Sequence, residues 1–182
     1  MILSLCYLKV EILSFVDIYT MKDILKYEDF VNEMNIVNKD MLAKGSYNQI
    51  YPLVTDPNKV IKIGTQAIEH GKIFKANPEY CPIVYKIVEN PNPYIVIEKL
   101  ETENARKDYE RLIDKDRGYI HNWGLNTFKR EKDYQSLREM LSDEGKKFLD
   151  RVREIVLAIQ MKDIHSRNFG YDKSKKLKAL DL

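Results

Sequence analysis

The stretch Asp163-Ile164-His165-Ser166-Arg167-Asn168, followed by Asp181 close to the last residue, decides how we interpret this chain. The Asp163 carboxylate can orient a reacting hydroxyl group. Asn168 and Asp181 offer side-chain oxygens, which are the ligands that a hard cation such as Mg²⁺ prefers. Each residue also has a plainer interpretation, because Asp163 or Ser166 can cap a local turn and Asn168 can adopt a turn conformation.

A second group of signals lies upstream. The segment Leu42-Ala43-Lys44-Gly45-Ser46-Tyr47-Asn48-Gln49-Ile50-Tyr51 is typical of two strands around a tight turn, and Val60-Ile61-Lys62-Ile63 is a β-branched strand that carries a lysine. With a turn at Thr55-Asp56-Pro57-Asn58, these segments predict a hairpin from 42 to 63. A lysine inside an apolar strand needs a reason, although an edge-strand lysine with its charge in water is the alternative.

In combination these segments resemble the protein kinase-like superfamily, and most closely the compact serine/threonine protein kinases of lytic bacteriophages. The resemblance rests on Leu42 to Tyr47, on Pro57-Asn58-Lys59-Val60-Ile61-Lys62-Ile63-Gly64 and on the stretch from Asp163 to Asn168. The pattern Asp-x-His-x-x-Asn, with His165 inside it, is also that of aminoglycoside phosphotransferase-like kinases. The class of phosphate acceptor therefore stays open.

The resemblance implies an α+β, protein kinase-like fold. Its N-lobe would be an antiparallel β-sheet with an αC-like helix, followed by a truncated, mainly helical C-lobe. The implied domains are an N-terminal extension over 1–40, helical or mixed, a kinase-like N-lobe over 41–100, and a truncated C-lobe over 101–182 that ends at the catalytic and metal loops.

The resemblance also implies roles for the polar residues. Asp163 and Lys62 would be catalytic, with Asp163 facing the acceptor hydroxyl and Lys62 pairing with the α and β phosphates of ATP. Asn168 and Asp181 would bind Mg²⁺. The implied cofactors are thus ATP and Mg²⁺.

The phosphate-covering loop is degenerate. Gly45 is present where three glycines are expected, and Gly45 and Ser46 are its candidate nucleotide-binding residues. Asn48 occupies a flanking glycine position, and we expect it to preserve the turn because asparagine tolerates positive φ.

Further nucleotide-binding candidates lie between the two ends. Residues 65–76 predict a short helix before Asn77-Pro78, and Glu69 on it is the candidate partner of Lys62, with Glu79 as the alternative. Glu69 is equally well explained as a solvated first-turn carboxylate. Strands are predicted over 82–88 and 94–100, and the chain after the second would be the hinge whose backbone, at Glu98 and Leu100, holds adenine.

The later part of the chain is charged and helical. Residues 101–115 predict a solvated helix, and 118–124 predict a loop. Ser142 is a good N-cap for the strongest helix in the sequence, because the apolar residues after it form one stripe that leads directly to Asp163. These residues are Phe148, Leu149, Val152, Ile155, Val156 and Ile159. The Lys173 to Lys178 cluster is expected to be a solvated turn, with binding of phosphate or of an acidic partner as the alternative.

Departures from the family pattern keep several functions open. Met161-Lys162 replaces His-Arg, Leu182 replaces the Phe of Asp-Phe-Gly, and no Ala-Pro-Glu segment follows. The first hypothesis is an ATP-dependent phosphotransferase of the Ser/Thr protein kinase type, phage-derived and acting on host proteins. The alternatives are a pseudokinase or nucleotide-binding interaction module, and a small-molecule kinase.

Composition excludes other classes. With 30 basic and 28 acidic residues, the net charge of +2 gives no reason to expect nucleic-acid binding. Cys6 and Cys81 are far apart, which favours a reduced, cytoplasmic setting, the host cytoplasm if the protein is viral. The apolar residues 1–8 are too short to span a bilayer. Three interpretations of these residues stay open. They form an extra strand or helix on the N-lobe, or translation starts at Met21 instead, or they are a weak membrane-associating tail.

Overall fold

A computed structural model describes residues 41–44, 48–89, 93–114 and 124–182. The predicted extension over 1–40 and nearly all of the predicted loop over 118–124 lie outside these residues. In the described part, no helix is long and apolar enough to cross a membrane.

A five-stranded antiparallel sheet forms the first half of the described chain, with the strand order β1-β2-β3-β5-β4. Its strands are β1 (Ala43–Lys44), β2 (Asn48–Pro52), β3 (Lys59–Gly64), β4 (Val84–Val88) and β5 (Tyr94–Glu98). The hairpin predicted over 42–63 and the two later strands are confirmed. Val60 and Lys62 pair with Ile97 and Ile95, so these four side chains share one face of the sheet.

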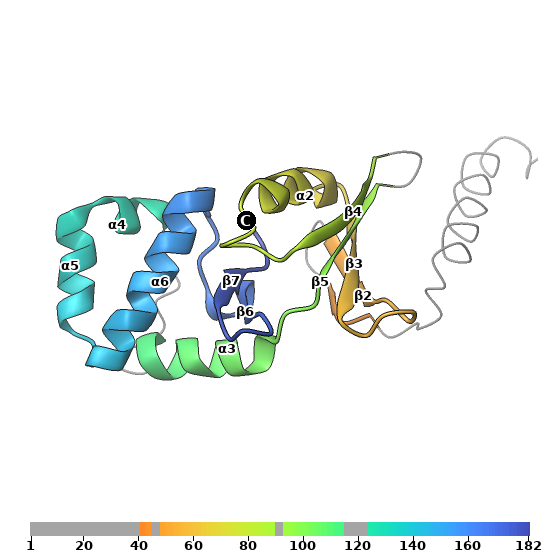
Figure 1. Ribbon diagram of the computed structural model, residues 1–182. Helices are drawn as coiled ribbons and strands as arrows, with labels where there is room; N and C mark the ends of the chain where they lie inside the picture. The colour runs from red at the N-terminus through yellow and green to blue at the C-terminus, as the bar shows by residue number, and fades with distance from the viewer. Residues whose placement is uncertain (1–40, 45–47, 90–92, 115–123) are drawn as a thin grey trace, which may run out of the picture.

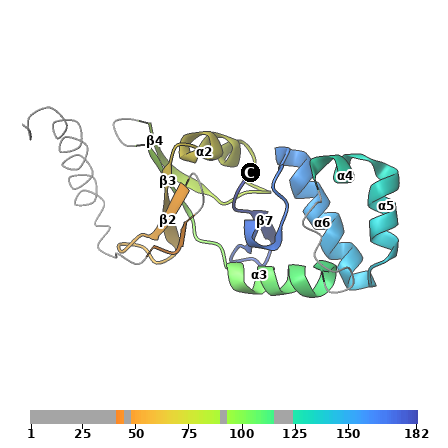
Figure 2. The same ribbon diagram turned by 180° about the vertical axis from the view of Figure 1, so that it is seen from behind.

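Helix α2 (Ala67–Ala76) follows β3 and covers that face, as Figures 1 and 2 show from opposite sides. It confirms the helix predicted over 65–76. The helix can approach the sheet closely because residue 71 is a glycine. A Cβ atom at Gly71 would lie 2.7 Å from Cγ2 of Ile95, a side chain that is completely buried in β5.

The second half is mainly helical. It contains α3 (Thr102–Tyr109), a π-helical turn (Glu110–Asp114), α4 (Leu125–Lys129), α5 (Glu131–Glu139) and α6 (Asp143–Ile159). Ser142 caps α6 by accepting a hydrogen bond from Gly145 N at 3.1 Å, which confirms the predicted helix and its start. The predicted apolar stripe is also confirmed, because Leu149, Val152, Ile155, Val156 and Ile159 are buried.

A small hairpin joins the two halves. A 3₁₀ turn (Ser166–Asn168) leads into β6 (Phe169–Tyr171), which pairs with β7 (Leu177–Ala179). In both views this hairpin lies between the five-stranded sheet and the helices. One hydrophobic cluster runs from Val60 and Ile97 through Phe169 and Ala179 to Val156. The sheet and the helices therefore share a continuous core, which fixes how they are placed around the site.

We expect Gly71→Ala to destabilise the protein. Alanine improves helix propensity by about 1 kcal/mol, but overpacking against Ile95 costs about 1–3 kcal/mol. The net loss of about 1 kcal/mol should lower Tm by roughly 2–4 °C in a thermal melt. Gly124→Ser is the control, because a Cβ there meets nothing within 4 Å. An unchanged or raised Tm for Gly71→Ala would contradict the close packing of α2.

Candidate functional site

The buried ammonium group of Lys62 is the centre of the site. The side chain is 1% exposed, and its Nζ atom lies 3.0 Å from Oδ1 of Asp181 and 2.8 Å from Nδ1 of His70. It also donates to the carbonyl oxygen of Leu180 at 3.3 Å and lies 5.6 Å from the centre of the Phe74 ring. The lysine predicted from the strand is thus not an edge lysine with its charge in water, because it is enclosed by α2 and by the segment after β7.

The electrostatics of this pair follow from burial. Burial lowers the pKa of Lys62, and the adjacent Asp181 carboxylate counteracts this by favouring the charged ammonium. Burial of Asp181 works to raise its pKa, but the hydrogen bond from His70 and the charge of Lys62 outweigh burial. The net pKa of Asp181 is held well below its usual range, so the carboxylate is ionised at neutral pH.

The partner predicted for Lys62 is wrong. Glu69 is exposed, and within the described residues the α2 side chain that reaches the ammonium group is that of His70. The phase of the helix explains the difference, since α2 buries Ala67, His70, Gly71 and Phe74. Position 69 is turned away from that face. The sequence contains a signal for this arrangement. Ala67, His70 and Phe74 are spaced by three and four residues, which predicts that they share the buried face of the helix.

The loop that carries Asp163 is anchored on both sides. Helix α6 ends with Gln160 in a left-handed conformation (φ 53°), and Met161 N bonds back to Val156 O at 3.1 Å. Met161 and Ile164 are buried at 0% and 5% exposure, whereas the Asp163 side chain is 66% exposed. The backbone of the loop is therefore held by apolar anchors while its carboxylate faces solvent.

His165 orients this carboxylate. Its Nδ1 atom accepts a hydrogen bond from Arg167 N at 3.2 Å, which leaves the proton of a neutral imidazole on Nε2. That Nε2 atom lies 3.3 Å from Oδ2 of Asp163. The other oxygen, Oδ1, has no protein donor among the described residues, so it is available to a ligand.

Asn168 and Asp181 are brought together by the β6–β7 hairpin. Leu180 N donates to Asn168 O at 2.8 Å, which places Asp181 one residue beyond that bond. Asn168 is 7% exposed, and its Nδ2 atom donates to Asp163 O at 3.0 Å. The amide group is thereby fixed, and Oδ1 of Asn168 and Oδ2 of Asp181 have no donor among the described residues.

These two oxygens fit Mg²⁺. In the part of the chain that the structure describes, no three His, Cys, Asp or Glu side chains gather as a metal cluster. Mg²⁺ commonly takes one or two protein oxygens and completes its octahedron with water and substrate phosphates. An amide oxygen and an ionised carboxylate next to a buried lysine match that requirement.

The structure describes the strands on both sides of the predicted phosphate-covering loop, but not residues 45–47 between them. Strands β1 and β2 pair with Ala43 opposite Ile50, but Gly45 and Ser46 lie outside the described residues. The turn that Asn48 was expected to preserve, residues 45–47, lies outside the described residues, and Asn48 itself does not adopt a positive φ. Asn48 begins β2 opposite Gly64 and is absent from the positive-φ residues of the described chain. Pairing with β3 holds it in an extended conformation, and its buried Oδ1 has no donor among the described residues.

The predicted hinge follows β5. The backbone N–H groups of Glu98 and Lys99 donate to Ile83 O and Asn58 O, both at 2.8 Å. The N–H of Leu100 has no hydrogen-bond partner among the described residues. Leu100 packs against Gly170 of β6, where a Cβ atom would lie 2.7 Å from Leu100 Cβ. This leaves the Leu100 N–H as a candidate backbone donor.

The Glu98 side chain has a structural task. Lys178, which we expected in a solvated turn, is 7% exposed on its side chain and lies 3.6 Å from Glu98 and 3.4 Å from Asp172. Its Nζ atom also donates to Pro78 O at 3.2 Å. The expectation for Lys178 is wrong because both faces of β7 are covered, so that Leu177, Lys178 and Ala179 are all buried. The three charges tie the hinge to the β6–β7 turn.

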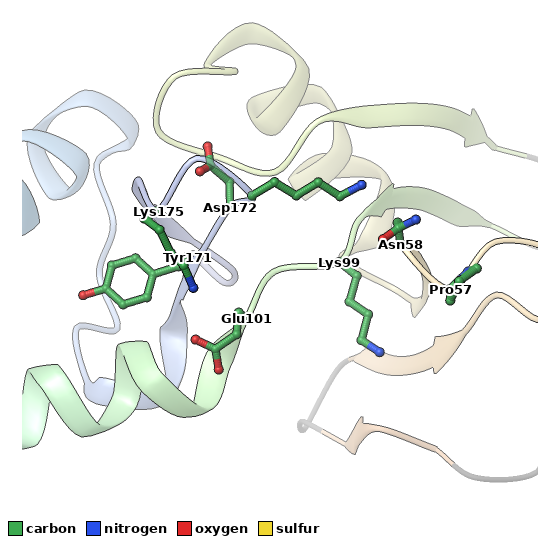
Figure 3. Close-up of a pocket in the computed structure, with 8 residues that line it drawn as sticks. Pro57, Asn58, Lys99, Glu101, Tyr171, Asp172 and Lys175 are labelled. Atoms are coloured by element: carbon green, nitrogen blue, oxygen red, sulfur yellow. The ribbon is translucent and has the colours of Figure 1, made fainter.

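A separate hollow lies outside this group, as Figure 3 shows. It is lined by Pro57, Asn58, Lys99, Glu101, Tyr171, Asp172, Lys173 and Lys175. It contains none of Lys62, Asp163, Asn168 and Asp181. The candidate site is defined by the hydrogen bonds and contacts that link these four residues and His70, and not by this hollow.

The sequence and the structure were compared with those of known proteins. No protein-family model matches the sequence, and no curated protein matches it. Among solved structures, the chain is similar to the aminoglycoside phosphotransferase APH(2″)-IIa in its ternary complex with streptomycin and ATP. The identity is 13% over 87% of this chain and 72% of that chain, with a TM-score of 0.34. We draw nothing about function from a likeness at this level.

Removal of the carboxylate should cost more stability than removal of the lysine. Asp181→Asn leaves a buried ammonium group without its ionic partner, which costs about 1–3 kcal/mol. Lys62→Met places an apolar side chain in an apolar position, while Asp181, 43% exposed, can be hydrated, so we expect a change within about 1 kcal/mol. Denaturant unfolding of both variants and the double variant measures this asymmetry. A larger loss for Lys62→Met would contradict it.

Proposed function

We propose that this protein is an ATP- and Mg²⁺-dependent phosphotransferase of the protein kinase type. The observation that carries the proposal is the buried Lys62 ammonium group in contact with Asp181, linked by hydrogen bonds through Leu180 to Asn168 and Asp163. The hairpin connects these groups in one cluster. A cation, two oxygen ligands and an exposed carboxylate are what phosphoryl transfer needs, since catalysis consists mostly of positioning and charge neutralisation.

The binding half of the mechanism belongs to Lys62. Burial fixes the position of its ammonium group on β3. The side chain therefore loses little conformational freedom when it pairs with nucleotide phosphates. Asn168 and Asp181 would hold Mg²⁺, which when bound neutralises phosphate charge. The Leu100 N–H, which has no partner among the described residues, would donate to an acceptor on the adenine ring.

The transfer half belongs to Asp163. With His165 on one carboxylate oxygen, the other is free to accept a hydrogen bond from an acceptor hydroxyl. The hydroxyl oxygen forms the new bond to the γ phosphorus while the bond to the bridging oxygen of ADP breaks. The hydroxyl proton passes to the Asp163 carboxylate. Its 66% exposure supports this role because the acceptor must reach it.

The finer assignment rests on the motif resemblance. We propose that α2 is the counterpart of helix αC, that the helices from α3 onward belong to a C-lobe, and that the acceptor is a serine or threonine of a protein, a host protein if the chain is phage-derived. The pattern around His165 keeps a small-molecule hydroxyl as the competing acceptor.

Nucleotide binding is tested by thermal shift. At about 100-fold excess over Kd, MgATP should stabilise the native state by about 2.7 kcal/mol and raise Tm by roughly 5–10 °C. Lys62→Met and Asp181→Asn should abolish most of this shift. Lys59→Met is the matched control on the same strand, because its charge pairs with Asp56 near the surface at 2.9 Å. No shift for the wild type at millimolar MgATP would refute the nucleotide site.

Transfer is tested with γ-labelled ATP against two acceptor pools, a protein mixture and aminoglycosides. Asp163→Asn should reduce turnover about 10²-fold or more, while it leaves the MgATP shift intact. Asp143→Asn, at a carboxylate 94% exposed on α6, is the control. Label in protein supports the Ser/Thr assignment, and label in the aminoglycoside pool supports the small-molecule alternative. Equal turnover of Asp163→Asn and wild type would remove Asp163 from the mechanism.

A nucleotide-binding module without transfer activity is the second candidate. It is favoured by the direct contact between Lys62 and Asp181, because phosphates must displace this ion pair before Lys62 can serve them. A normal MgATP shift with no label transferred to either acceptor pool would select this candidate over the enzyme.

A further inference from the structure

His70 forms a closed triangle with the two charged groups of the site. Its Nδ1 atom lies 2.8 Å from Lys62 Nζ and 3.0 Å from Asp181 Oδ1, and those two atoms are 3.0 Å apart. The histidine is 4% exposed and its ring lies 5.9 Å from that of Phe74, tilted by 50°. Gly71, the next residue, allows α2 to approach β5 closely enough for these contacts.

One nitrogen cannot satisfy both neighbours at once. If Nδ1 is unprotonated, it accepts from the Lys62 ammonium group, and its contact with Asp181 joins two acceptors. If Nδ1 carries the proton, it donates to Asp181, and its contact with the ammonium group joins two donors. In either neutral tautomer two edges of the triangle are favourable and one is not.

The unfavourable contact would be lost if Asp181 moved away from His70 to bind a cation. When Asp181 turns its carboxylate toward a cation, the contact between Asp181 and His70 opens. The Nε2–H tautomer then keeps a single favourable bond, from the Lys62 ammonium group to Nδ1. A neutral imidazole at this position would add no negative charge beside Lys62, whereas a carboxylate would add one.

We propose that His70 is a positioning residue of the phosphate site. It holds Lys62 and Asp181 together before the nucleotide binds, and it alone holds Lys62 from helix α2 afterwards. This proposal rests on the proposed function for its ligand and on the triangle for its geometry.

The first experiment needs no nucleotide. A ¹H–¹⁵N correlation spectrum of the imidazole nitrogens, recorded at one fixed pH, should show the Nδ1 resonance of His70 moving in Lys62→Met and in Asp181→Asn. It should not move in Lys59→Met, whose charge lies in a surface pair. A His70 resonance unmoved by both Lys62→Met and Asp181→Asn overturns the proposal, whatever the protein binds.

The second experiment measures MgATP affinity in variants of the ring. His70→Phe keeps the aromatic volume but has no nitrogen, and we expect Kd to rise about tenfold with little change in Tm measured without nucleotide. His70→Asn places an amide near the Nδ1 position and should stay within about threefold of wild type, whereas His70→Gln, whose amide reaches toward Nε2, should not. Glu69→Gln, on the exposed face of the same helix, should bind normally.

The outcomes separate this proposal from the proposed function. Normal binding by His70→Phe, or equal losses in His70→Phe and His70→Asn, overturns the positioning role. A loss in Glu69→Gln without a loss in His70→Phe overturns it in favour of the carboxylate. If the wild type binds no nucleotide while the His70 resonance moves as expected, the proposed function fails and the part of the proposal that joins His70 to Lys62 and Asp181 is supported.

Discussion

The buried charge of Lys62 is the constraint on which the rest of the structure depends. An ammonium group 1% exposed in the middle of β3 is tolerated only with close polar partners, because its desolvation is unfavourable by several kcal/mol. Those partners come from α2 and from the residues after β7. A single lysine therefore requires two segments distant in sequence to converge on the sheet, and that convergence is the candidate site.

A second buried lysine, Lys178, helps to hold the β6–β7 hairpin against the sheet. Lys178 on β7 contacts Glu98, Asp172 and the carbonyl of Pro78, so it joins the end of β5 to the β6–β7 turn and to the loop after α2. Ala179 N also donates to Tyr80 O at 2.8 Å. The hairpin that delivers Asn168 and Asp181 is thus fixed against the sheet as well as against α6.

Much of this was predictable where one physical signal dominated. A β-branched run located β3, and an apolar stripe behind a serine cap located α6. Helices α4 and α5 escaped prediction because they bury little beyond Phe128 and Tyr134, so no stripe marks them. His70 escaped because a buried lysine suggests a carboxylate partner, whereas the phase of α2 decides which side chain reaches it. Lys178 shows the same limit of local signals. Composition predicted solvent exposure for it, but elements packed on both faces of β7 bury it.

A neutral imidazole in place of a carboxylate changes the charge balance of the site. Lys62 and Asp181 together carry no net charge, whereas a further glutamate from α2 would make the group negative and would oppose an incoming phosphate. Under the proposed function, a phosphate would replace Asp181 on the lysine while Asp181 turned to a cation, so that each charge would gain a new partner. Such an exchange would leave the contact between His70 and Lys62 in place, so the lysine would keep its partner on α2 in both states.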